Sequence, residues 1–79
     1  PGRAQYRLHL DPPRTNRSGE VRIRGWLGSS NNVSRTAEGV VLVTEDKRGG
    51  LRHRRLPDDT DVAEMRAALA VAAWLRRQR

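Results

Sequence analysis

Arginine and aliphatic residues alternate in one short segment of this chain, and this two-residue period constrains the fold more than any other feature. The segment is Val21-Arg22-Ile23-Arg24, and Tyr6-Arg7-Leu8-His9-Leu10 has a similar alternation. In a β-strand, successive side chains point to opposite faces of the sheet. We therefore expect strands at residues 4–10 and 20–27, with apolar side chains on one face and cationic side chains on the other.

The size and composition of the chain favour a single small basic domain over residues 1–79. Fifteen arginines stand against one lysine, and the formal net charge is +7. A chain of this length buries only about 60 to 65% of the surface that it exposes when unfolded, so a deep pocket is not expected. The start at Pro1-Gly2, without methionine, suggests a fragment of a longer protein or a processed chain.

The middle of the chain predicts a long loop followed by a hairpin. Residues 28–39 are rich in glycine, serine and asparagine and read as a loop, and residues 14–19 read as an exposed turn. Residues 40–44 are a continuous aliphatic and β-branched run, typical of a central strand. Residues 51–56 then form the returning strand, and we expect Gly49 and Gly50 to supply the positive φ angles of the hairpin turn.

A helix is predicted from about Val62 to the end of the chain. Asp61 and Glu64 have the spacing of a capping box. One stripe of the helix is suited to packing on the sheet, and it consists of Val62, Met65, Leu69, Ala72 and Ala73.

The resulting fold class is α+β, a small antiparallel sheet of three or four strands with one C-terminal helix packed on one face. This order of elements is similar to that of the sheet-plus-helix DNA-binding modules at the arm-binding ends of some integrases and in one class of plant transcription factors. The Trp26-Leu27-Gly28 triplet resembles part of the plant pattern. The rest of that pattern is missing and the helix follows at a different spacing, so the resemblance implies architecture and not membership.

The leading functional hypothesis is a nucleic-acid-binding module, with DNA favoured over RNA. Arginines on one sheet face can contact phosphates and base edges, and a tryptophan among them can stack on a base. The alternative is an ordinary solvated face, with acidic residues pairing part of the charge. The predicted nucleic-acid-binding residues are Arg7, His9, Arg22, Arg24, Trp26, Arg35, Arg52 and Arg54.

The second hypothesis is an accessory or assembly domain that forms a homodimer or docks on a larger protein. The far side of the predicted helix carries Val71, Trp74 and Leu75, which are the predicted partner interface. Alanines tolerate exposure and Trp74 can fold over a domain edge, so an unpartnered helix is the alternative. The two functional hypotheses are compatible, because a contact through the helix leaves the other sheet face free.

Enzymatic activity, metal binding and cofactor binding are not expected. His9 and His53 could act as acid and base, but nothing in the sequence fixes their mutual geometry. Asp58, Asp59 and Asp61 precede the helix and are better explained by capping than by a metal site. The sequence contains no cysteine and no apolar segment long enough to cross a bilayer, so we expect a cytoplasmic protein with no membrane partner.

Overall fold

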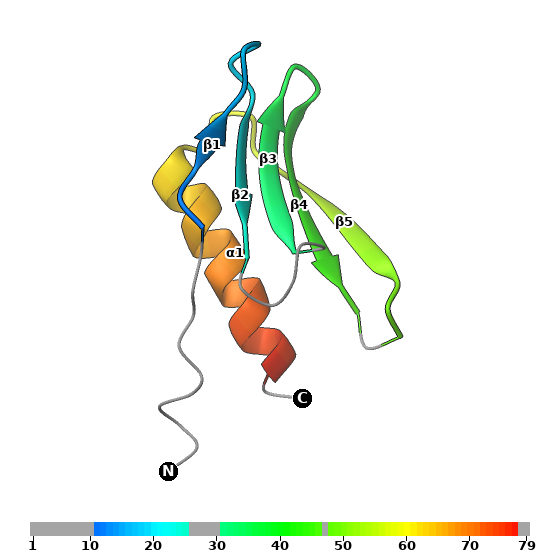
Figure 1. Ribbon diagram of the computed structural model, residues 1–79. Coiled ribbons are helices and arrows are strands. Elements are labelled where there is room, and N and C mark those ends of the chain that lie inside the picture. Colours follow the sequence, from blue (N-terminus) through cyan, green and yellow to red (C-terminus); the bar gives the residue numbers. More distant parts are fainter. Residues whose placement is uncertain (1–10, 26–30, 47, 78–79) are drawn as a thin grey trace.

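The computed structural model describes residues 11–25, 31–46 and 48–77, with the side chains of 73, 76 and 77 excepted. It shows an antiparallel sheet with one helix across one face (Figure 1). Within these residues, five strands lie side by side in the order of the sequence. The elements are β1 (Arg14–Thr15), β2 (Val21–Arg24), β3 (Asn32–Thr36), β4 (Gly39–Glu45), β5 (Leu51–Leu56) and α1 (Val62–Arg77).

The α+β class and the C-terminal helix are confirmed, but the expected count of three or four strands is wrong. β3 lies inside the predicted loop at 28–39, and β1 lies inside the predicted turn at 14–19. Val33 explains the first difference, because it is fully buried and pairs with Ile23 on one side and Leu42 on the other. The strand expected at 4–10 falls outside the described residues.

The hydrophobic core lies between the sheet and α1. Met65 and Leu69 of the helix are fully buried, and α1 packs mainly on β3 and β4. The predicted stripe is confirmed for its described side chains, because Val62 and Ala72 pack against this core; Ala73 lies outside the described side chains. No helix in the described part of the chain is long and apolar enough to span a membrane. The buried core residues are Ile23, Val33, Val40, Leu42, Leu56, Met65 and Leu69.

Two polar turns set the registers of the outer hairpins. In the β1–β2 turn, the side-chain oxygen of Asn16 accepts hydrogen bonds from the amides of Ser18 and Glu20, at 2.9 and 3.0 Å. In the β4–β5 turn, Asp46 Oδ1 accepts from the amide of Gly50 at 2.8 Å. Of the two glycines predicted to have positive φ, only Gly49 does, with φ of 84°.

The start of α1 is held by the predicted capping box. The amide of Asp61 donates to Glu64 Oε1 at 2.9 Å, and the amide of Glu64 donates to Asp61 Oδ1 at 2.7 Å. Each of these bonds satisfies a backbone N–H that the helix itself leaves unpaired. Asp58 has a different role, because it forms an exposed ion pair with Arg55 at 3.5 Å.

Candidate nucleic-acid interface

The face of the sheet that points away from α1 is here called the open face. Its composition follows from the strand register and from the buried side chains that face the helix. One row of directly paired residues crosses all five strands on this face, in the order Arg14, Arg22, Ser34, Val41 and Arg55. A second row consists of Arg24, Asn32, Val43 and His53.

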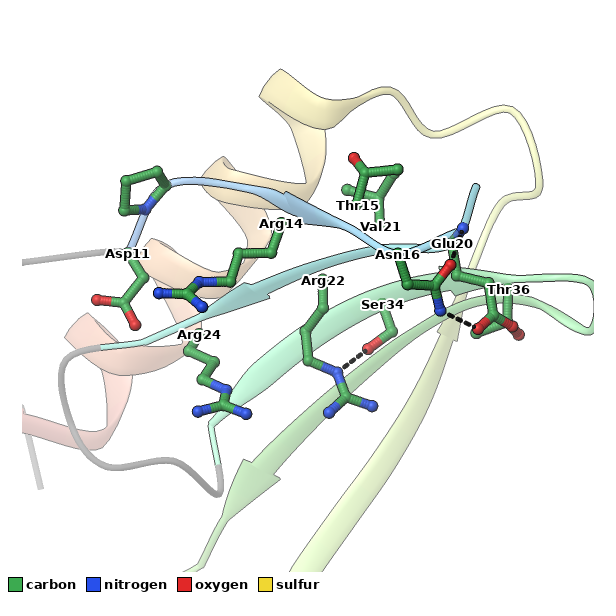
Figure 2. A pocket seen from close by; sticks show the side chains of 11 residues that line it. Asp11, Arg14, Thr15, Asn16, Glu20, Val21, Arg22, Arg24, Ser34 and Thr36 are labelled. Atoms are coloured by element: carbon green, nitrogen blue, oxygen red, sulfur yellow. Dashed lines mark hydrogen bonds between the residues drawn. The ribbon is translucent and has the colours of Figure 1, made fainter. Parts of the chain in front are cut away.

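Three arginines gather at the β1 edge of the open face, and we call Arg14, Arg22 and Arg24 the arginine cluster. Arg14 and Arg22 lie directly opposite each other on strands that are roughly 4.8 Å apart. The Nε of Arg22 donates to Ser34 Oγ at 3.2 Å, which directs its guanidinium along the sheet (Figure 2). None of the three forms an ion pair with another described residue.

The arginine cluster borders a shallow pocket of about 320 Å³. Ser34 and Thr36 contribute hydroxyl groups to its lining, and Asp11 and Glu20 contribute carboxylates. Glu20 is already engaged, because its Oε1 accepts a hydrogen bond from Asn16 Nδ2 at 2.7 Å (Figure 2). Ser34 Oγ donates to Asn32 Oδ1 at 3.5 Å, which leaves the Thr36 hydroxyl as a donor. The pocket therefore combines three guanidinium groups that form no ion pair with another described residue, one hydroxyl donor and the Asp11 carboxylate, and positive charge predominates in it.

The local sequence explains why these arginines face outward. Ile23 is fully buried against the helix, so its neighbours Arg22 and Arg24 must point to the open face. The predicted alternation is thus confirmed for Val21–Arg24. Arg14 joins them because the turn around Asn16 fixes the pairing of Arg14 with Arg22.

Arg52 and Arg54 do not lie on this face, contrary to the expectation. Arg54 pairs with Leu42, which is buried beneath α1, and Arg52 has the same parity along β5. The sequence left the parity of β5 open, because Leu51 and Leu56 favour opposite faces. Leu56 is the one that is buried, at 8% exposure against 52% for Leu51, so His53 and Arg55 occupy the open face instead.

Arg35, predicted as a nucleic-acid contact in the loop at 28–39, lies instead in β3 on the helix side of the sheet. It pairs with Val40, which is fully buried. Its Nη2 donates to the backbone carbonyl of Thr60 in the segment before α1. Arg35 therefore ties β3 to the start of the helix, and the structure gives it a structural role.

The remaining predicted site residues divide into two groups. Arg7, His9 and Trp26 fall outside the described residues. The predicted partner interface is exposed, with 55% of Val71, 52% of Trp74 and 48% of Leu75 accessible to solvent.

Two arginines of the open face were not predicted as site residues. Arg14 was missed because Pro12 and Pro13 argue against a strand, although the Asn16 to Gly19 turn is a hairpin signal that could have found it. Arg55 was missed because it depends on the parity of β5. Arg55 also differs from the arginine cluster because its guanidinium group already has partners. Its Nη2 donates to the carbonyl of Glu38 at 2.8 Å, and it forms an ion pair with Asp58.

Known proteins and metal chemistry give no further indication of function. Comparison with protein-family models, curated proteins and solved structures finds no match to this chain. Within the described residues, no three histidine, cysteine, aspartate or glutamate side chains gather as ligands for a metal ion would. The case for function therefore depends on the geometry and charge of the open face.

Proposed function

We propose that this protein binds duplex DNA through the arginine cluster at the β1 edge of its open face. The observation that carries the proposal is the placement of Arg14, Arg22 and Arg24 on adjacent strands without an anionic partner among the described residues. Like charges directly opposite each other on a sheet are destabilising. A bound polyanion would remove that repulsion.

Phosphate is the anion that best suits this cluster. Guanidinium groups make two-pronged hydrogen bonds to phosphate oxygens and to guanine edges, which a lysine ammonium does not. The Thr36 hydroxyl lies beside the cluster and can donate a further hydrogen bond. Neutralising the phosphates also releases condensed counterions, which favours binding at low salt.

The position of the cluster at a sheet edge favours DNA over RNA. The major groove of B-DNA is about 12 Å wide and admits a two-stranded ribbon. The β1–β2 hairpin forms one edge of the described sheet and can present that edge to such a groove. Figure 1 shows their connecting turn at one end of the molecule. The major groove of A-form RNA is too narrow for side chains to read.

The direct test is the affinity for a mixed-sequence DNA duplex at 50 and 300 mM salt, measured by fluorescence anisotropy. Three phosphate contacts predict an affinity about 100-fold lower at the higher salt concentration. A duplex of the same sequence made of RNA should bind more weakly. An affinity that does not change with salt would contradict the proposal.

A matched pair of variants tests whether the open face is responsible. Arg22→Glu with Arg24→Glu should abolish binding, whereas Arg52→Glu with Arg54→Glu should reduce it only modestly. The two variants change the net charge equally, and all four side chains are exposed, so both should fold. Equal losses in the two variants would show that net charge alone matters and that the assigned face is wrong.

A further inference from the structure

The sheet is wider than the one helix that covers it. Five strands place the outer strand axes about 20 Å apart, while a helix with its side chains is about 10 Å across. α1 packs mainly on β3 and β4, so among the described elements most of the helix-side face of β5 is left uncovered beside it. The space forms a groove of about 780 Å³ between α1 and β5.

One wall of this groove is cationic. Arg48, Arg52 and Arg54 line it, and none of them forms an ion pair with another described residue. Glu45 also lines the groove, so three arginines stand against two carboxylates there. Asp46 is the second carboxylate, and its Oδ1 accepts hydrogen bonds from the amides of Arg48 and Gly50. That carboxylate is therefore occupied in shaping the β4–β5 turn.

The opposite wall is apolar and continues onto the exposed side of α1. Leu42 and Ala72 lie in the groove, and Leu75 lines it from the helix. Leu75 is four residues after Val71, so the two side chains neighbour each other on one helix face, and Trp74 lies next to them. All three are about half exposed. Through Leu75, the apolar wall of the groove thus adjoins this exposed patch of α1.

The charges decide against a second copy of this chain as the occupant. Each copy carries a net charge of +7, and the helix that would enter the groove of its partner is itself flanked by arginines at 66, 76 and 77. Placing that helix beside Arg52 and Arg54 would bring like charges together. A nucleic acid is disfavoured by the apolar wall, which offers its phosphates no donors.

We propose that the groove between α1 and β5 binds an acidic amphipathic helix of a partner protein. Its apolar stripe would pack on Ala72 and Leu75 and its carboxylates would pair with Arg52 and Arg54. The two walls of the groove match the two faces of such a segment. The site is on the opposite face of the sheet from the arginine cluster, so the proposal is independent of DNA binding.

The probe is a synthetic peptide of about four helical turns, with leucine at the i, i+3, i+4 and i+7 positions and glutamate elsewhere. The isotope-labelled protein is titrated with it and followed by amide NMR shifts. Shifts should concentrate at Thr44, Arg52, Arg54 and Leu75. A peptide of the same composition in shuffled order should bind about tenfold more weakly or not at all, and a peptide with lysine in place of glutamate should not bind.

The same matched variants, with their roles exchanged, test the site. Arg52→Glu with Arg54→Glu should weaken peptide binding about tenfold or more, and Arg22→Glu with Arg24→Glu should leave it within about twofold. Equal affinity for the ordered and shuffled peptides would overturn the proposal. So would displacement of the peptide by duplex DNA from these same residues, or a dimer in sedimentation that Leu75→Arg converts to a monomer.

Discussion

Arg54 lies directly opposite Leu42 in the ladder between β4 and β5. Leu42 is buried beneath α1, so Arg54 must point to the helix side of the sheet, and its neighbour Arg55 must point to the open face. The run Arg52-His53-Arg54-Arg55 is thereby divided between the two faces of the sheet. A shift of one residue in this register would exchange the two sets of side chains.

The burial of Leu56 is what fixes this register, and its loss should destabilise the protein. Leu56→Ala should reduce the free energy of unfolding by about 2 kcal/mol or more, because it leaves a cavity in the core cluster beside its strand partner Val40. Leu51→Ala is the matched control and should change it by less than about 0.5 kcal/mol. Urea denaturation measures both changes. Equal effects would show that Leu56 and Leu51 are assigned to the wrong faces of β5.

The sequence predicted the elements whose local signals agree with their surroundings. The aliphatic run of β4, the hairpin into β5 and the capping box of α1 each have such a signal, and each is confirmed. β3 was missed because Val33 is its only large apolar residue and polar residues surround it. Its strand conformation depends on pairing with β2 and β4, which are distant in sequence and leave no local pattern.

Arg35 should contribute to stability and not to DNA affinity. Arg35→Ala removes the hydrogen bond to the carbonyl of Thr60, a residue that is 6% exposed, and should cost about 1.5–3 kcal/mol of unfolding free energy. Thermal unfolding measures this loss. DNA affinity, measured well below the unfolding temperature, should fall only by the small amount expected from removing one positive charge that does not contact the DNA. A decrease as large as that of Arg24→Ala would contradict the structural role.

Asn31 should be a second stabilising residue at the end of the sheet. It is 3% exposed, and its Oδ1 accepts a hydrogen bond from the amide of Glu45 at 3.1 Å. Its own carbonyl accepts from the amide of Gly25 at 2.7 Å. Asn31→Ala should cost about 1–3 kcal/mol, because it leaves the Glu45 amide without that acceptor. Hydrogen exchange should then accelerate at Glu45 and remain unchanged at Gly25.

The capping box predicts unequal effects among the acidic residues before α1. Asp61→Ala should reduce the free energy of unfolding by about 1 kcal/mol, because Asp61 accepts from the amide of Glu64. Asp58→Ala should have a smaller effect, because its ion pair with Arg55 is exposed. Chemical denaturation of the two variants gives the ranking, and the reverse order would contradict the assigned cap.

The candidate site was only partly predictable, for a reason that lies in the pattern of each strand. In β2, Val21 and Ile23 both favour the same face, so the outward placement of Arg22 and Arg24 could be predicted. In β5, Leu51 and Leu56 compete, and the outcome depends on where the helix begins to cover the sheet. In β3, Arg35 forms its hydrogen bond with Thr60, which is 25 residues further along the chain. No local sequence pattern therefore distinguishes this structural arginine from one that binds a ligand.

The arginine cluster and Arg52 and Arg54 lie on opposite faces and toward opposite edges of the sheet, because β2 and β5 are separated by β3 and β4. Three strand spacings are about 14 Å, which is more than the Debye length of about 8 Å at physiological ionic strength but less than the roughly 30 Å at 0.01 M salt. Neutralising one surface with an anionic ligand would weaken the electric field at the other. The two ligands should therefore bind with reciprocal negative cooperativity in dilute buffer and almost independently in concentrated salt.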